Sequence, residues 1–253
     1  MKIKEILKDS VIFDDGVQLY SNGDLKAEAE QRYIHSMYDV WETPKPYFSY
    51  VSSGDWLGNL DVPEDVRQKL MKKFVIGPED TVIDVGVYAG WNTVRMSQQA
   101  NLVFAIEADK DNCKMVEKNI QANGIKNIIL INMAAGAEPG EMTFYHSNHG
   151  QAKSLFRKSL HKVVRTEKIK VDKIDNVIKS ATFVTLDINL GDLDALKGME
   201  KLLIKDDLRI IAAGFYTQGK VQSCYLIKEY LDSLGYHVYI GKMGRVYATK
   251  NLD

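Results

Sequence analysis

From residue 81 to the end of the chain, short apolar segments alternate with longer segments whose apolar residues recur every three or four positions. The short segments are nearly continuously apolar, which is typical of strands buried on both faces, and the longer ones have the period of amphipathic helices. The five strands predicted in this way are 81–86, 102–108, 127–134, 182–188 and 208–216. Their alternation with helices indicates βαβ units, so the sequence predicts a doubly wound, mostly parallel α/β sheet.

Two further pairs of strands are predicted outside these units. The segments 141–147 and 167–174 alternate between apolar and polar residues, and a polar loop separates them. The last segment, 236–250, is predicted to be an antiparallel hairpin that turns between Lys242 and Gly244. The expected sheet domain therefore ends in a C-terminal antiparallel hairpin.

The residues before the first predicted strand have a different pattern. Segments 28–41 and 61–74 have helical periodicity, and the aromatic, turn-rich segment 44–60 lies between them. We therefore expect a small, mainly helical N-terminal cap over residues 1–76, followed by the α/β sheet domain over residues 77–253.

Composition and charge limit the class of protein. The chain has 253 residues, of which 45% are hydrophobic and 26% charged, and its formal net charge is -1. These values are typical of globular proteins and give no overall attraction to nucleic acid or to an anionic membrane. The longest nearly apolar run, 128–137, is about half of the roughly 20 residues that a bilayer span needs, and the N-terminus lacks the apolar core of a secretory signal. We therefore expect a cytoplasmic protein without a membrane partner.

The stretch TVIDVGVYAGWN, residues 81–92, is the first with chemical character. Gly86 and Gly90 follow a buried strand, and ligands of open α/β sheets bind at the carboxyl ends of strands. Tyr88 stands where a dinucleotide-binding turn has its middle glycine, which disfavours a pyrophosphate cradle, yet both glycines let a ligand approach closely. Glu107 ends the next strand about 20 residues later, where an acid accepts hydrogen bonds from ribose hydroxyls. Turn and acid together predict an adenosine-type ligand.

Four blocks of sequence lie at or after the ends of the predicted strands. They are VIDVGVYAG at 82–90, FAIEADKDN at 104–112, NIILINMAAGAEPGEMTFY at 127–145 and LDINLGDLDALKGMEKLL at 186–203. The order and spacing of these blocks resemble the FkbM-type S-adenosylmethionine-dependent methyltransferases. The resemblance spans about residues 77–203, and it implies a seven-stranded methyltransferase-type sheet with S-adenosyl-L-methionine as the cofactor.

The resemblance also implies cofactor contacts from the ends of four strands. The residues implied are Asp84, Gly86, Gly90 and Thr93 for the turn that holds the methionine end, Glu107 for the ribose, Asn132, Met133 and Ala134 beside the adenine, and Asp187 near the transferring methyl group.

The part of the sequence that corresponds to the substrate half departs from the family pattern. The family usually has Asn at the position of Tyr88, and an Asp-Val-Glu-Gly-Ala-Glu block where residues 187–192 read Asp-Ile-Asn-Leu-Gly-Asp. A Glu-x-His element is usual where this chain has Ala213 and Phe215. The residues implied to bind the cofactor match the family pattern, whereas those in the part that corresponds to the substrate half do not. The family's usual substrate is therefore in doubt for this chain.

The reaction implied is methyl transfer to a hydroxyl group, for which an acceptor base is needed. Asp187 is the first candidate to orient or deprotonate the acceptor, and binding of the cofactor's ammonium group is an equal alternative. His146 and His149 lie in or beside a polar loop and are the second candidates, the alternative being that both are simply exposed. Asp187, Asn189 and Asp192 offer oxygen ligands for a divalent cation, but no supporting ligand is found elsewhere, so no metal is predicted.

The segment 157–173 carries seven Lys or Arg residues and two acids. This segment is either a solvated basic surface or a surface that attracts an anionic acceptor, and nucleic acid is the next alternative for the ligand. No Asn-Pro-Pro-Tyr-type block for a flipped base follows the fourth strand.

The sequence thus predicts O-methylation of a small-molecule or glycan hydroxyl. The alternatives are an RNA or DNA methyltransferase, a cofactor-binding protein without catalysis, and a different nucleotide-binding α/β enzyme.

Overall fold

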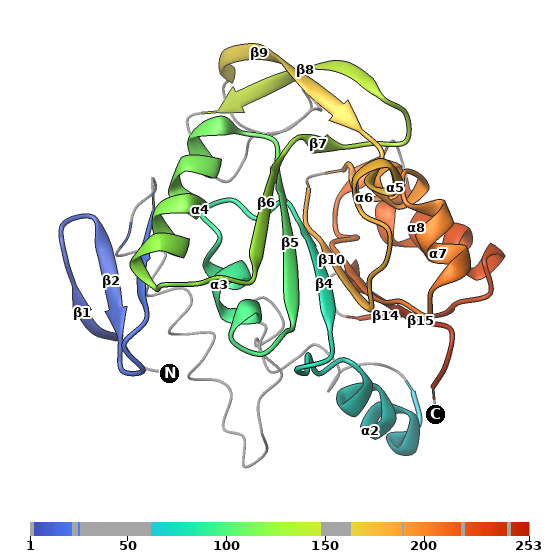
Figure 1. Ribbon diagram of the computed structural model, residues 1–253. Coiled ribbons are helices and arrows are strands. Elements are labelled where there is room, and N and C mark those ends of the chain that lie inside the picture. The colour runs from blue at the N-terminus through green and yellow to red at the C-terminus, as the bar shows by residue number, and fades with distance from the viewer. Residues whose placement is uncertain are drawn as a thin grey trace.

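The computed structural model describes residues 3–21, 25, 62–147, 163–188, 190–218, 221–241 and 244–252. Its main sheet has seven strands: β4 (Thr81–Val85), β5 (Leu102–Glu107), β6 (Ile128–Asn132), β10 (Phe183–Leu186), β11 (Arg209–Ala212), β14 (His237–Ile240) and β15 (Val246–Thr249). Their order is β14-β15-β11-β10-β4-β5-β6 (Figure 1). Strand β15 runs antiparallel to β11 and β14, and the remaining neighbours are parallel. The predicted doubly wound sheet and its C-terminal hairpin are confirmed.

Helices cover both faces of this sheet. They are α2 (Glu64–Lys73), α3 (Trp91–Ser97), α4 (Lys110–Ala122), α5 (Ile174–Val177), α6 (Asp192–Lys197), α7 (Glu200–Lys205) and α8 (Ser223–Ser233). Alternate residues of a strand point to opposite faces. Ile83 and Val85 of β4 therefore pack with apolar residues of α6, α7 and α8, whereas Val82 packs with Leu70 of α2 and Met96 of α3. Among the described residues, no helix is long and apolar enough to cross a membrane.

The strand order reverses between β4 and β10. From β4 the chain proceeds outward to β5 and β6, then returns to β10 on the other side of β4 and continues to β11. The loops that follow β4 and β10 therefore leave in opposite directions, and such a switch point is where ligands bind in open α/β sheets.

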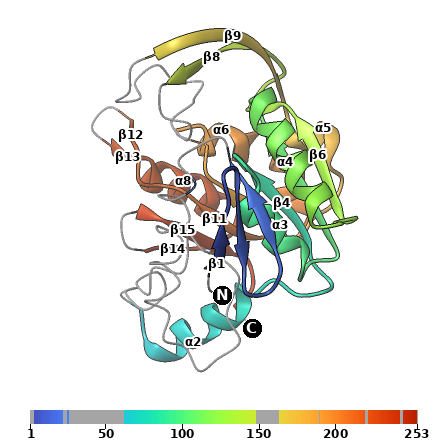
Figure 2. The same cartoon turned by 90° about the vertical axis from the view of Figure 1, so that its left-hand side faces the viewer.

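A second, smaller sheet lies at this carboxyl edge. It contains β7 (Ala134–Ala135), β9 (Val163–Asp172) and β8 (Gly140–Ser147), in that order, with β8 and β9 antiparallel. Because β7 follows β6 directly, the small sheet lies at the end of the molecule opposite α2 (Figure 1, Figure 2). The two strands predicted at 141–147 and 167–174 are therefore present, and they pair with each other. A short hairpin, β12 (Thr217–Gln218) with β13 (Val221–Gln222), precedes α8.

The N-terminal region contains a sheet that the sequence pattern does not predict. The strands β1 (Ile3–Ile6), β2 (Ser10–Phe13) and β3 (Gln18–Tyr20) form an antiparallel sheet that packs beside α3 and α4 (Figure 2). The helix predicted at 61–74 is present as α2, whereas the predicted helix at 28–41 and the aromatic segment 44–60 lie outside the described residues. The described part of this region thus consists of three strands and one helix.

Candidate functional site

The glycine turn after β4 is tightly folded. Gly86, Tyr88 and Gly90 all have positive φ angles, of 85°, 54° and 75°. A Cβ atom at Gly86 would lie 2.5 Å from the carbonyl oxygen of Asp187, so only glycine fits between the ends of β4 and β10. Glycine adopts positive φ at no steric cost, whereas a tyrosine in this region is strained and needs external support. The turn therefore depends on the groups around it.

A hydrogen bond between Asp84 and Thr93 connects the two segments on either side of the turn. The Thr93 hydroxyl donates a hydrogen bond of 2.6 Å to Oδ2 of Asp84, which joins β4 to the first turn of α3. Both side chains are buried. Burial raises the pKa of Asp84 to about 7, against the Thr93 hydrogen bond and with smaller contributions from the Asp187 and Glu107 charges. Asp84 therefore supports the turn, and its predicted contact with a cofactor stays a prediction.

Glu107, the predicted ribose acid, is buried at the end of β5. Its Oε2 accepts a hydrogen bond from the backbone N–H of Tyr88 at 2.8 Å, and Oε1 accepts from the N–H of Asp109 at 2.9 Å and from Asn112 Nδ2 at 3.3 Å. Burial raises the pKa of Glu107 to about 7 although these hydrogen bonds oppose the shift. Each carboxylate oxygen has two lone-pair directions, so the side chain retains acceptor capacity. Glu107 thus links the glycine turn to the start of α4.

The end of β6 supports this acid through the backbone. Asn132 Nδ2 donates to the carbonyl oxygens of Glu107 and Ala108, at 2.9 and 3.1 Å, and Met133 N donates to the carbonyl of Glu107 at 3.1 Å. The side chain of Met133 is buried in the core with α6, α7 and α8, and Ala134, in β7, is buried in an apolar cluster with residues of β8 and β9. The three residues do lie beside Glu107, and the contact of Met133 with adenine remains a prediction.

Two carboxyl groups lie just after β10. The carboxyl of Asp187 accepts no hydrogen bond from any described residue, and burial raises its pKa against the smaller influence of the Arg245 guanidinium. Asp192, in the first turn of α6, is 1% exposed, and its Oδ2 has no partner among the described residues. Burial, followed by the charge of Asp187, raises the pKa of Asp192 to about 8. Asp187 is half-buried, and Asp192 accepts from the N–H of Ile188 at 3.4 Å through Oδ1 only. A buried carboxyl oxygen without a partner is costly, so this pair is suited to a cationic or hydrogen-bonding ligand.

The cation site considered at Asp187, Asn189 and Asp192 receives no support from the described structure. Asn189 lies outside the described residues. Within the described part of the chain, no group of three or more His, Cys, Asp or Glu side chains is arranged to hold a metal ion.

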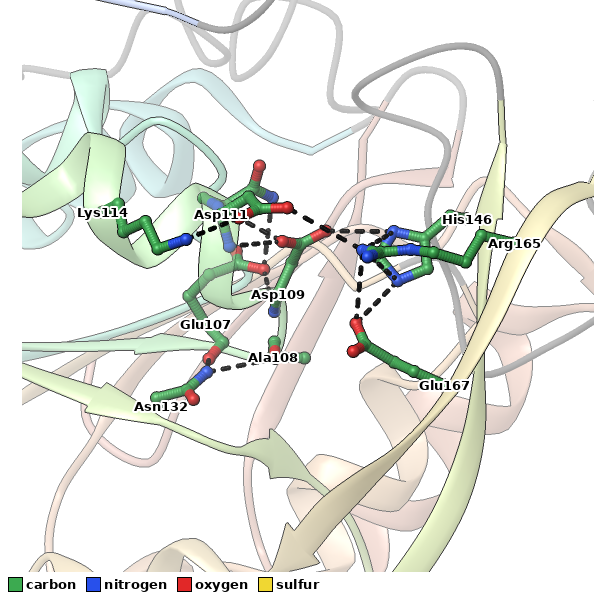
Figure 3. A network of polar contacts seen from close by, with 10 residues as sticks. Glu107, Ala108, Asp109, Asp111, Lys114, Asn132, His146, Arg165 and Glu167 are labelled. Carbon is green, nitrogen blue, oxygen red and sulfur yellow. Dashed lines mark hydrogen bonds and ion pairs between the residues drawn. The ribbon is translucent and has the colours of Figure 1, made fainter.

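His146 lies between the small sheet and α4, in a polar network that Asp109 connects to Glu107 (Figure 3). Its Nε2 is 2.7 Å from Oε1 of Glu167, and its Nδ1 is 3.3 Å from Oδ2 of Asp109. Arg165 NH2 lies within 3.3 Å of both ring nitrogens. Asp109 is also the N-cap of α4, where its carboxylate accepts from the N–H of Asp111. His146 therefore joins two elements, and its role as a base stays a prediction; His149 lies outside the described residues.

The structure thus brings Asp84, Gly86, Glu107 and Asp187 together at the carboxyl ends of three adjacent strands, β5, β4 and β10. Sequence reasoning missed the asparagines of α4. Asn112 and Asn119 are buried on the apolar face of this helix, and polar residues in such a face were the available signal.

Comparisons with known proteins agree with this arrangement. Residues 79–183 match the family described as RNA cap guanine-N2 methyltransferase. A curated protein of Methanococcus vannielii, named probable cobalt-precorrin-6B C(15)-methyltransferase (decarboxylating), is 33% identical over 64 residues, which are 25% of this chain and 36% of that protein. The crystal structure of the methyltransferase FkbM from Methylobacillus flagellatus has a TM-score of 0.50 at 14% sequence identity, over 88% of this chain and 59% of that one.

The fold is therefore that of the Rossmann-like methyltransferases, and the family match supports the class that uses S-adenosylmethionine as cofactor. The matched segment includes the glycine turn and Glu107 and ends before Asp187. The chain spans only part of the relatives it matches, 36% of the curated protein and 59% of the FkbM structure. At 14% identity the similarity to FkbM is a similarity of fold, and the expected FkbM-type membership stays a prediction.

Proposed function

We propose that this chain is an S-adenosylmethionine-dependent methyltransferase that methylates a hydroxyl group of a small molecule or glycan. The observation that carries the proposal is the pair Asp187 and Asp192. Asp187 lies at the switch point of the sheet, beside the glycine turn, and its carboxyl accepts no hydrogen bond from a described residue. The carboxyl of Asp192 accepts from the backbone N–H of Ile188 through Oδ1 at 3.4 Å, and its buried Oδ2 has no partner among the described residues. In an open α/β sheet this is the position at which a ligand binds.

The described residues fit the cofactor. Glu107 accepts two hydrogen bonds at Oε1 and one at Oε2, so Oε2 keeps a lone-pair direction that can accept from a ribose hydroxyl. The carboxyls of Asp187 and Asp192 suit a ligand that carries cationic groups, and S-adenosylmethionine carries an ammonium and a sulfonium. When bound, the cofactor supplies an activated methyl group, so the protein has to align the acceptor and remove its proton.

Asp187 is our candidate for the group that accepts the acceptor's proton. Its raised pKa makes the carboxylate a stronger base than an exposed aspartate, and a general base works best when its pKa lies near the operating pH. Asp192 lies on the same side and its charge is coupled to that of Asp187, so protonation of one favours ionisation of the other.

Calorimetry with S-adenosylhomocysteine, followed by methylation assays with a panel of hydroxyl acceptors, tests the proposal. Asp187→Asn separates the two roles of this residue. If Asp187 is the base, the variant binds the cofactor like wild type and turns over about 100-fold or more slowly. If it binds the ammonium group instead, cofactor affinity falls first. Absence of cofactor binding by the wild type contradicts the proposed function.

RNA methylation is the second candidate, because the matched family is described as an RNA cap guanine-N2 methyltransferase. An RNA enzyme should bind RNA with an affinity that falls steeply as salt rises. Methyl transfer to capped RNA, measured beside the hydroxyl panel, decides between the two acceptors. Cofactor binding without transfer to any acceptor would favour a binding protein that has lost catalysis.

A further inference from the structure

Asn119, which lies outside the predicted cofactor set, joins the N-terminal sheet to the glycine turn. Its side chain is fully buried in α4. Nδ2 donates a hydrogen bond of 2.7 Å to the carbonyl oxygen of Ala89, which lies in the turn between Gly86 and Gly90. The same amide bonds both backbone groups of Tyr20 in β3: Nδ2 donates to the carbonyl at 2.9 Å, and Oδ1 accepts from the N–H at 2.6 Å. One side chain therefore connects two segments that are distant in sequence.

Asn123 repeats half of this arrangement one helical turn later. Its Oδ1 accepts from the N–H of Gln18 at 2.9 Å and its Nδ2 donates to the carbonyl of Gln18 at 2.7 Å. Alternate strand residues are about 6.7 Å apart and residues four apart in a helix rise about 6 Å, so the two asparagines match the outer edge of β3. They hydrogen-bond the backbone of β3 along its outer edge, where no further strand of this sheet pairs with it. Only Asn119 also reaches the glycine turn.

Further contacts join the N-terminal sheet to the turn. Trp91 Nε1 donates to the carbonyl oxygen of Tyr20 at 2.7 Å, and the Tyr88 hydroxyl lies 3.4 Å from Ser21 Oγ. Ala89 and Trp91 share a buried apolar cluster with side chains of β2 and β3. The strained turn is thus held on one side by Glu107, through the N–H of Tyr88, and on the other side by the N-terminal sheet.

We propose that Asn119 is a positioning residue for the cofactor, and that the N-terminal sheet forms part of the cofactor site by holding the turn in its binding conformation. The inference rests on the proposed function, because it concerns the turn to which we assign the cofactor. Strained backbone persists only where its surroundings fix it. Coupling between two sites is reciprocal, so docking of the sheet and binding of the cofactor favour each other by the same factor.

Asn119→Ala and Asn123→Ala, made in the full chain, are a matched pair of variants. Both lose two hydrogen bonds to β3, and we expect amide hydrogen exchange in β3 to become faster in both. Only Asn119→Ala loses the bond to Ala89. We expect its Kd for S-adenosylhomocysteine to rise by about five- to tenfold, the effect of about one hydrogen bond, and that of Asn123→Ala to stay within about twofold. At saturating cofactor, Asn119→Ala should turn over like wild type, because Asn119 contacts no reacting group.

Equal losses of affinity in the two variants, or faster exchange in Asn119→Ala with an unchanged Kd, would overturn the inference. Trp91→Phe is a second variant, which keeps an aromatic ring but loses the N–H to Tyr20 together with part of the ring that packs against Phe13, so it applies even if Asn119→Ala does not fold. We expect a Kd about threefold higher or more, and an unchanged Kd counts against the inference. Failure of the wild type to bind the cofactor is a different result: it contradicts the proposed function and removes the inference with it.

Discussion

The carboxylate of Glu107 serves the fold and the ligand site together. Glu107→Ala leaves the half-buried N–H of Tyr88 and the buried N–H of Asp109 without their acceptor, which should cost about 1–3 kcal/mol of unfolding free energy for each donor. Loss of the ribose acceptor should also weaken S-adenosylhomocysteine binding by about tenfold or more. Urea denaturation measures the first effect and calorimetry the second.

Asn112→Ala is the control for this variant. It removes one donor from the same carboxylate and leaves the link between Glu107 and the turn in place. We expect a loss of stability with little change in Kd. Cofactor affinity that is unchanged in Glu107→Ala would contradict the ribose role, whatever happens to stability.

The sequence predicts some of these residues and not others, for a physical reason. Gly86 and Glu107 are found because each sits at a strand end with the spacing that a nucleoside site requires. Asn119 is missed because its partner, Tyr20, lies 99 residues away in a strand whose position depends on tertiary packing. A polar residue in the apolar stripe of a helix indicates a buried hydrogen bond but does not name the partner.

At the scale of elements, the contact between the small sheet and α4 depends on His146. His146→Ala leaves the buried carboxylate of Asp109 without its imidazole partner and removes the contact between the imidazole and the Glu167 carboxylate. We expect a loss of about 1–3 kcal/mol in unfolding free energy, near-normal cofactor affinity and a retained pH–rate profile. If His146 is the acceptor base, turnover should instead fall about 100-fold or more. His237→Ala, at an exposed histidine of β14, controls for the loss of an imidazole.

The break between α6 and α7 is a second feature at this scale. A Cβ atom at Gly198, just after α6, would lie 2.1 Å from the carbonyl oxygen of Gly136 in the loop after β7. The two backbones can approach this closely only because residue 198 has no side chain. Gly198→Ala should destabilise the protein by about 1–3 kcal/mol, because the backbone must shift. Gly124→Ala is the matched control: its Cβ would meet nothing within 4 Å, and only its φ of 62° is unfavourable, at about 1 kcal/mol. Equal unfolding midpoints for the two variants in urea would refute the steric argument.

The elements differ in how far the sequence determines them. Strands such as β4 and β5 are predicted because their apolar runs are buried on both faces of the main sheet. The N-terminal strands are three or four residues long, and β1 is mostly exposed with charged residues. Such segments carry too little apolar pattern to be recognised, and they are stable as strands because α3 and α4 cover them.

Four carboxyl groups next to strands of the main sheet differ in the direction of their pKa shifts. At the carboxyl edge, burial raises the pKa of Asp84 and of Glu107 to about 7, and that of Asp192 to about 8. At the amino edge, burial also acts on Asp80, but hydrogen bonds, the Arg209 guanidinium first among them, hold its pKa below the ordinary value. At neutral pH the carboxyl groups of this edge are therefore partly protonated. They can lose these protons when a cationic ligand binds, because a nearby positive charge favours the ionised form.

This distribution fixes the sign of the pH dependence of stability. Between the ordinary carboxyl pKa values near 4 and the raised values of about 7 and 8, the folded state binds more protons than the unfolded state. The unfolding free energy of the apoprotein should therefore fall as pH rises from about 5 to about 8.5. Asp80 has the opposite effect, and its stabilisation is lost only in more acidic solution. Urea denaturation across this range measures the slope, and stability that rises with pH would contradict the prediction.

Asp192→Asn identifies the largest contributor to that slope. The amide is nearly isosteric and stays neutral, so the variant should be more stable than wild type near pH 8.5, by an amount on the order of a few kcal/mol, and its pH dependence should be flatter. Asp194→Asn removes a negative charge from the same helix start and controls for the helix dipole.

A cationic ligand should favour the ionised carboxyls, so S-adenosylmethionine binding to wild type near pH 7 should release protons, and the binding enthalpy should vary with the ionisation enthalpy of the buffer. Proton release that persists unchanged in Asp192→Asn would show that another carboxyl of the edge carries the titration.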